Sequence, residues 1–191
     1  GVIEVLHFIF AMTLCENVVP TKSDFSSLIH IDKKIVEHAQ MLGATLTFKD
    51  SNYATISASG CNYNFEILGQ STVPNYHRIV VRNLDTDETY LYMKGNYENV
   101  IPFTNLTDSK IEELEDMLEL HDIRGMRQLY LAYKQLSYEE YKQFKYAYTH
   151  ALLSPVNSRG RVEGVLEEYQ QGSSLLGILG LQEVISQETK D

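Results

Sequence analysis

The sequence predicts an α+β fold with a single antiparallel sheet flanked by helices. Between residues 44 and 93, apolar and polar residues alternate in short runs, and only a few turn residues separate one run from the next. Runs this close together favour antiparallel neighbours, because parallel strands need a long crossover connection. Apolar residues recur at helical spacing before and after this stretch, which predicts helices packed against the sheet.

The strands are predicted from their period of two and from the turn residues between them. Residues 69–75, which include Pro74, are expected to form a loop, and residues 85–87 the turn of a hairpin. The predicted strands span residues 44–49, 53–57, 63–68, 77–82, 89–93, 128–133 and 175–181.

The helices are predicted from apolar stripes and capping residues. Residues 2–14 are apolar on nearly every side, so we expect a core helix, one too short to cross a bilayer. Ser137 and Glu140 form a capping box for a helix that runs to about residue 152. Its inner stripe is expected to be Tyr138, Tyr141, Phe144, Tyr148 and Leu152. Two further helices are predicted over residues 32–42 and 162–170. Another is expected to begin at a cap formed by Thr107 or Asp108 and to end at about residue 121. Loops are expected over residues 17–27 and 155–160.

The charge balance excludes several classes of partner. The chain has 26 acidic and 16 basic side chains, a formal net charge of −10, and no long basic stripe. Nucleic acid and anionic membrane surfaces would be repelled by most of such a surface. ATP binding would need a local positive pocket, so the few well-placed cations matter. Cys15 and Cys61 are too few for a disulfide framework and are expected to be buried, reduced thiols.

Sequence motifs for catalysis or metal binding are absent. There is no phosphate-binding loop, and the glycines Gly177 and Gly180 are interpreted as sites of close backbone packing in an apolar strand. The six histidines show no metal-ligand spacing. Any nucleotide pocket must therefore be built from residues far apart in the sequence.

Several short blocks follow one another along nearly the whole chain in the order of a known family. The blocks are residues 6–18, 32–43, 63–82, 90–95 (Tyr-Leu-Tyr-Met-Lys-Gly), 125–134 (Gly-Met-Arg-Gln-Leu-Tyr-Leu-Ala-Tyr-Lys) and 175–183. Together they resemble the nucleotide-binding (N) domain of type IV P-type ATPases, the lipid-flippase branch. The family's Leu-Tyr-x-Lys-Gly-Ala and Gly-Leu-Arg-Thr-Leu-x-Leu-Ala-Tyr-Arg are similar to the two blocks written out.

The resemblance implies that residues 1–191 form one N domain excised from a larger protein, with residues 184–191 as a frayed tail toward the phosphorylation domain. The chain contains no Asp-Lys-Thr-Gly-Thr, so it is expected not to transfer phosphate alone. The implied ligand is ATP, with Mg²⁺ entering only through the nucleotide. The implied partners are the phosphorylation and actuator domains of the same chain. The resemblance further implies a cytosolic domain of a multi-pass membrane protein, without membrane contact of its own and monomeric when isolated.

The resemblance also assigns nucleotide-binding positions. Lys94 and Gly95 match the family's Lys-Gly, Arg127 matches the Arg beside the phosphates, and Asp32 stands where the family has Glu. A guanidinium can grip two phosphate oxygens, and glycine permits close backbone approach. The competing interpretations are a helix N-cap for Asp32, a surface salt bridge for Arg127 and a strand-end charge facing water for Lys94.

The pocket departs from the family pattern at the position of the adenine-stacking Phe, which is Gln70 here. The family's basic Arg-Lys-Arg-Met-Ser run is replaced by Pro-Asn-Tyr-His-Arg at residues 74–78, in which Tyr76 is a candidate replacement ring. We therefore expect weak ATP binding or none. Such erosion suggests a regulatory domain in a protein that joins an ATPase-like half to a guanylate cyclase. The alternatives are an active phospholipid-translocating ATPase and a scaffold that binds another protein.

Overall fold

The computed structural model of the chain describes residues 2–15, 18–20, 25–27, 43–123 and 126–182. Seven strands form one antiparallel sheet in the order β3-β4-β5-β6-β7-β8-β9, so each strand lies beside its neighbour in sequence. The strands are β3 (Ala44–Lys49), β4 (Tyr53–Ala58), β5 (Cys61–Val73), β6 (Tyr76–Asn83), β7 (Thr89–Gly95), β8 (Met126–Leu136) and β9 (Ser174–Gln182). The predicted α+β meander is confirmed.

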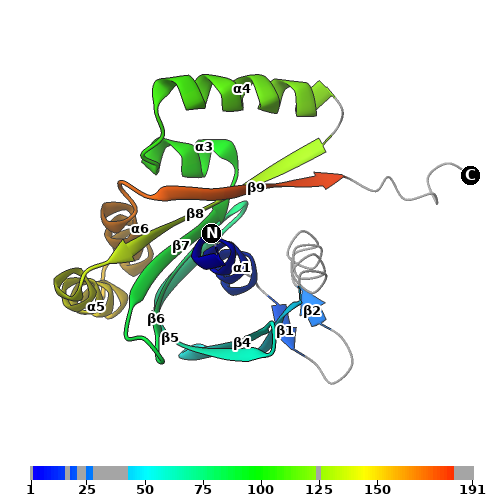
Figure 1. The fold of residues 1–191 in the computed structure, drawn as a ribbon. Helices are drawn as coiled ribbons and strands as arrows, with labels where there is room; N and C mark the ends of the chain where they lie inside the picture. The colour runs from blue at the N-terminus through cyan, green and yellow to red at the C-terminus, as the bar shows by residue number, and fades with distance from the viewer. Residues whose placement is uncertain (1, 16–17, 21–24, 28–42, 124–125, 183–191) are drawn as a thin grey trace, which may run out of the picture.

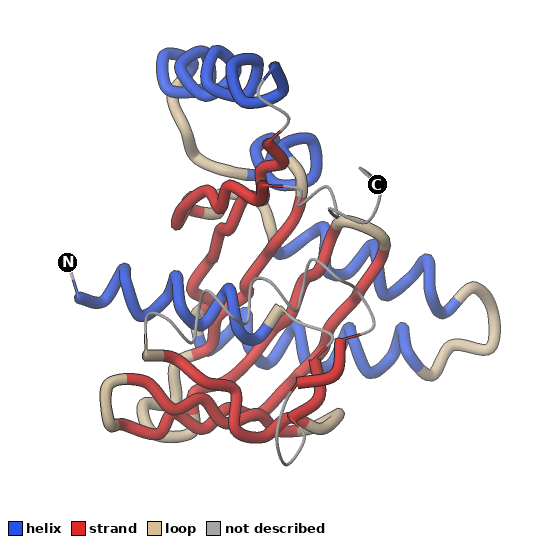
Figure 2. The backbone as a smooth tube through the Cα atoms, turned by 90° about the vertical axis from the view of Figure 1, so that its right-hand side faces the viewer, coloured by secondary structure: helices blue, strands red, loops and turns tan. Residues whose placement is uncertain are grey.

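The sheet curls, and its two faces are covered by different helices. Figure 1 shows α1 (Val2–Leu14) inside the curl, on the concave face, with α5 (Tyr138–Leu152) and α6 (Ser158–Tyr169) on the convex face. At one end of the sheet lie α3 (Tyr97–Val100), the 3-10 helix η1 (Ile101–Phe103) and α4 (Asp108–Ile123), as Figure 2 also shows. Each face therefore has its own apolar core.

The middle of β6, residues 79–81, is apolar without alternation because both faces of the sheet are covered there. Ile79 and Val81 pack in the concave core with α1, whereas Val80 packs in the convex core with Phe144 of α5. Because both faces of the strand are covered, polar residues have no solvated face to occupy.

The predicted core helix α1 is buried along its second half. Ala11, Met12 and Leu14 are fully buried, whereas Ile3 and Val5 at its start are exposed. Gly177 of β9 lets this helix approach closely, because a Cβ there would lie 2.6 Å from Phe8 Cε2. The interpretation of this glycine as a close packing site is confirmed.

Two of the predicted loops contain strands instead. Residues 17–27 include β1 (Val18–Pro20) and β2 (Phe25–Ser27), which pair with each other, and a two-stranded ribbon tolerates proline at its edge. Residues 69–73 continue β5 after a bulge between Ile67 and Gly69. Gly69 is needed for packing rather than for a turn, since a Cβ there would lie 2.8 Å from the Tyr148 ring.

The capping box at Ser137 and Glu140 is confirmed, since each side chain accepts a hydrogen bond from the other's backbone amide. The predicted stripe of α5 is only partly right, because Tyr138 and Leu152 are exposed. At 100° per residue, these two lie about 120° and 80° around the helix from Phe144, too far to reach the sheet. α6 begins at Ser158, earlier than predicted, and Cys61 is exposed rather than buried.

A buried polar network ties α6 to the convex face. The Arg78 guanidinium forms an ion pair with Glu163, whose other oxygen accepts a hydrogen bond from Ser71. Arg78 Nη1 also donates to Gln170 Oε1 at 3.2 Å. The network fixes the helix over the ends of β5 and β6, next to Tyr76, whose hydroxyl also donates to Gln170.

Candidate functional site

Gln70 and Lys94 lie on the concave face of the sheet. Gln70 pairs with Ile79, a residue of the concave core, and directly opposed residues share a face. Lys94 follows the concave-core residue Tyr92 by two positions along β7. It is only 6% exposed. The interpretation of Lys94 as a strand-end charge facing water is therefore wrong.

His77 joins them on the concave face and was not predicted as a site residue. It pairs directly with Lys94 across the β6–β7 hairpin and is 2% exposed. Burial, followed by the charges of Lys49 and Lys94, holds its pKa well below the ordinary value, against a smaller opposing effect of the Cys15 backbone. The predicted hairpin could have revealed this position, because the strand pattern already placed His77 two residues from Ile79.

Lys49 brings a second ammonium group to the same face. It pairs with Ala54 of the concave core, and its Nζ donates to the backbone oxygen of Leu14 at 2.9 Å. The last carbonyls of a helix carry partial negative charge, so the end of α1 is a favourable place for this cation. Lys49, His77 and Lys94 thus gather at one end of α1.

Tyr76 and Gly95 face the other way. Tyr76 packs in the convex core, its hydroxyl donates to Gln170 Oε1 at 3.0 Å, and the Arg78 guanidinium carbon lies 4.5 Å from its ring centroid. Burial raises the pKa of this phenol to about 12. An offset of one residue along a strand moves a side chain to the opposite face. The Tyr76 ring therefore lies across the sheet from Gln70 and does not replace a ring beside Lys94.

Gly95 has a packing reason within the fold itself. A Cβ at this position would lie 2.8 Å from Tyr76 Cδ1 and 3.0 Å from the backbone oxygen of Asn75. The close approach that glycine permits is thus made by the neighbouring strand and its tyrosine ring.

For the two remaining predicted site residues, Asp32 and Arg127, the structure gives less information. Asp32, with the helix predicted over residues 32–42, lies outside the described residues, as does the tail at residues 184–191. The backbone of Arg127 pairs with Leu181, while Lys94 pairs with Leu131 further along β8. The two β8 positions are about 13 Å apart at the rise of a strand, with Arg127 beyond the Gly95 end of β7.

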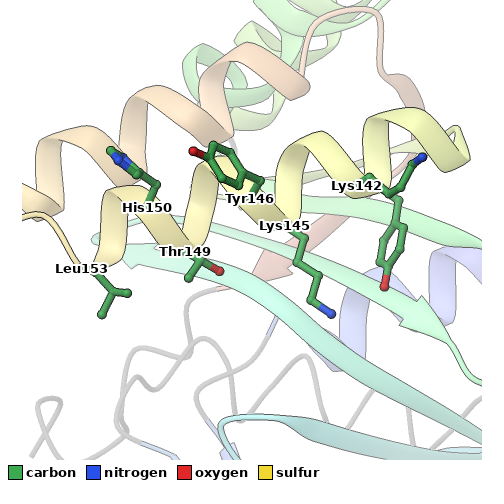
Figure 3. Close-up of a pocket in the computed structure, with 7 residues that line it drawn as sticks. Lys142, Lys145, Tyr146, Thr149, His150 and Leu153 are labelled. Atoms are coloured by element: carbon green, nitrogen blue, oxygen red, sulfur yellow. The ribbon is translucent and has the colours of Figure 1, made fainter.

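One surface hollow, whose lining residues are drawn in Figure 3, lies elsewhere. It measures about 580 Å³, and its lining comes from α5 and the residue that caps its C-terminus, Leu153, on the convex side of the sheet. A hollow along one helix is open to solvent, so it does not enclose a ligand as a nucleotide pocket does. Its lining residues are Tyr141, Lys142, Lys145, Tyr146, Thr149, His150 and Leu153.

Within the described ranges, no group of three or more His, Cys, Asp or Glu side chains is placed to hold a metal ion. Nor does any helix there have the length and hydropathy to cross a membrane.

The chain is similar to several phospholipid-transporting ATPases, although no protein-family model matches it. Phospholipid-transporting ATPase NEO1 of Saccharomyces cerevisiae is 26% identical over 200 residues, which cover 97% of this chain and 17% of that protein. Phospholipid-transporting ATPase neo1 of Schizosaccharomyces pombe is 27% identical over 196 residues, with 97% and 18% covered. Phospholipid-transporting ATPase 2 of Arabidopsis thaliana is 22% identical over 191 residues, with 96% and 17% covered.

The chain thus spans less than a fifth of the length of these relatives and aligns with one segment of them. The resemblance to flippase-like ATPases is confirmed by these matches.

Proposed function

We propose that this chain is the nucleotide-binding domain of a flippase-like P-type ATPase and that it binds ATP weakly on the concave face around Lys94. The observation that carries the proposal is the burial of Lys94 on that face, directly opposite His77, with Gln70 on the same face two residues further along the sheet. A buried cation in an acidic domain is suited to an anionic ligand. Relatives named phospholipid-transporting ATPases support the assignment to a flippase-like ATPase.

Weak affinity follows from the residue at position 70. An amide side chain cannot stack on adenine as an aromatic ring does, and such stacking is worth about 1–3 kcal/mol. Loss of this stacking raises the Kd for ATP by roughly 5- to 150-fold. Because Tyr76 packs on the convex face, it offers no substitute ring there. Arg127 and Asp32 are proposed to complete the site, with Mg²⁺ arriving on the nucleotide.

The proposed role in the parent protein is regulatory. The chain lacks the phosphate-accepting Asp-Lys-Thr-Gly-Thr, so phosphorylation and actuator domains of the same polypeptide are its proposed partners. The proposal that the parent protein also contains a guanylate cyclase half rests only on the differences from the family pattern at Gln70 and residues 74–78. Sequencing the coding region on both sides of this chain distinguishes such a protein from an active phospholipid-translocating ATPase.

A thermal-shift titration with ATP, with and without Mg²⁺, tests the proposal. Ligand at ten times Kd stabilises the folded state by about 1.4 kcal/mol. For a domain of this size, that raises Tm by roughly 3–6 °C. Lys94→Met is expected to abolish the rise. Lys134→Met is the matched control, because Lys134 pairs with Leu91 of the convex core. No rise at 10 mM ATP, or an equal rise in Lys94→Met, contradicts the proposal.

A scaffold role is the second candidate, and the exposed face of α5 favours it. Tyr146 of α5 is 74% exposed, and Leu153, which caps the C-terminus of this helix, is 76% exposed. Apolar side chains grouped on a surface often mark a protein contact. Sedimentation equilibrium tests whether the chain is monomeric as proposed. Self-association that Tyr146→Ser removes, with no ATP effect, would favour the scaffold.

A further inference from the structure

We propose that α5 and α6 together form a docking groove for an acidic amphipathic helix, a peptide segment with carboxylates on one side and leucine-like side chains on the other. This hairpin groove runs over the outer face of α5 and into the space between the two helices, which lie side by side on the convex side of the sheet (Figure 1). Lys94 is on the concave face, so the groove adds an interaction to the proposed nucleotide function and does not depend on it.

Two adjoining hollows make up the hairpin groove. The first, drawn in Figure 3, measures about 580 Å³ and lies along α5, and the second measures about 450 Å³ and lies between α5 and α6. Tyr146 and His150 line both hollows, so the two join along α5. Tyr146 is about 160° around the helix from the buried Phe144, so this part of the groove points away from the sheet. Elongated grooves on helical surfaces are places where amphipathic helices dock.

The hairpin is positive in an acidic chain. Residues 141–162 contain no Asp or Glu, although 26 of the 191 residues of the chain are acidic. The same stretch has four exposed cations: Lys142, Lys145, Arg159 and Arg161. Of the neighbouring carboxylates, Glu139 pairs with Lys142 at 3.2 Å, Glu163 pairs with the buried Arg78, and Glu168 lines the second hollow. The charge of the groove is therefore complementary to an acidic ligand.

Exposed apolar side chains gather on the same hairpin. Among the described residues, five of the eleven exposed large apolar side chains lie within residues 138–156: Tyr138, Tyr146, Leu152, Leu153 and Val156. The partner must therefore offer apolar contacts as well as carboxylates. A peptide segment can contact the hairpin alone, whereas an anionic membrane would also meet the rest of a surface whose net charge is −10 and would be repelled.

A glycine in the middle of α6 keeps the groove open. Gly164 lines the second hollow, and a Cβ added there would have no heavy atom within 4 Å. Glycine is among the weakest helix formers, and the packing of the described residues gives no reason for it at this position. Room for a ligand side chain against the α6 backbone supplies such a reason.

Three labelled peptides test the chemistry of the partner by fluorescence anisotropy, each as long as α5, 15 residues. The first has Glu and Leu at amphipathic helical spacing, the second has Gln in place of Leu, and the third has Lys in place of Glu. The Glu-Leu peptide should bind the chain at least about tenfold more tightly than either of the others. Equal affinity for the Glu-Gln peptide, equal affinity for the Lys-Leu peptide, or no binding at millimolar Glu-Leu peptide each overturns the proposal.

Single variants locate the peptide on the hairpin. Lys145→Glu, which reverses an exposed charge, should weaken Glu-Leu binding by about fivefold. Tyr146→Ser should weaken it by about tenfold, as expected for the loss of a large aromatic contact. The matched controls are Lys110→Glu on α4, where the lysine side chain is 49% exposed, and Tyr53→Ser on β4, where the tyrosine is 48% exposed. Controls that weaken binding as much as the hairpin variants place the peptide elsewhere and overturn the proposal.

Gly164→Gln separates the groove from the stability of the fold. Glutamine is a better helix former than glycine, so Tm should not fall. Its side chain would occupy the second hollow, so binding of the Glu-Leu peptide should weaken by about tenfold. Unchanged affinity in this variant contradicts a ligand seated between α5 and α6.

The other occupants of the hairpin are tested with the same variants. Binding to vesicles of phosphatidylserine and phosphatidylcholine that Tyr146→Ser removes, without peptide binding, would assign the hairpin to a membrane and overturn the proposal. Self-association in sedimentation equilibrium that Tyr146→Ser removes would assign it to a second copy of the chain, with the same consequence. Peptide binding without ATP binding supports the groove and contradicts the nucleotide function, whereas ATP binding without peptide binding overturns the groove alone.

Discussion

Replacing Glu163 with alanine is expected to destabilise the fold by about 2–3 kcal/mol, because it removes the carboxylate partner of a buried guanidinium. The Arg78 side chain is only 4% exposed, while that of Glu163 is 31% exposed. Breaking a fully buried ion pair costs about 3–5 kcal/mol. Water can reach the Glu163 position, and Gln170 Oε1 still accepts a bond from Arg78, so the lower figure applies.

Thermal and urea unfolding of the 191-residue chain measures this loss. A loss of about 2–3 kcal/mol lowers Tm by roughly 4–12 °C. Glu168→Ala is the matched control, because Glu168 is an exposed carboxylate on the same helix. It should change stability by less than about 0.5 kcal/mol.

A double variant separates the buried charge from the general loss of packing. Arg78→Met with Glu163→Leu removes both charges, so it should be more stable than Glu163→Ala alone. A Glu163→Ala variant as stable as the wild type would refute the reasoning. So would a double variant that unfolds more easily than the single one, since the buried charge would then not be the source of the cost.

Three further predictions concern single positions. Gly95→Ala should cost about 1–3 kcal/mol in urea unfolding, because its Cβ would lie 2.8 Å from Tyr76 Cδ1; an unchanged midpoint contradicts the packing described. Ser137→Ala should cost about 1 kcal/mol by loss of the capping box, with Ser51→Ala, at an exposed position in the turn between β3 and β4, as the control. The low pKa of His77 in the folded state means that its contribution to stability is full above the unfolded value of 6.5 and is lost as pH falls below it. As pH falls below 6.5, the stability of the wild type should therefore fall more steeply than that of His77→Met; parallel pH profiles would show that His77 protonates as readily when folded.

The sequence was sufficient for the sheet because each strand carries a local signal. Period-two runs and short turns set the order of the strands, and Ser137 with Glu140 marked the start of α5. Gly69 was misleading, because a glycine required by the Tyr148 ring in a bulged strand has the same local pattern as one in a turn.

The candidate site was predicted less well because it depends on register. Which of Tyr76 and His77 shares a face with Lys94 is decided by the pairing of β6 with β7, and a shift of one residue exchanges them. Tyr76 attracted attention as an aromatic residue, whereas His77 showed no motif. The meeting of Lys49 with the end of α1 joins residues far apart in the sequence, and no local pattern contains it.

The most direct test of the central claim is to map ATP binding onto the backbone by amide chemical shifts. ATP should shift the amides of Gln70, His77 and Lys94, at the ends of β5, β6 and β7 on the concave face. Shifts confined to α5, around Tyr146 and His150, or no shifts at millimolar ATP, would contradict a nucleotide site on that face.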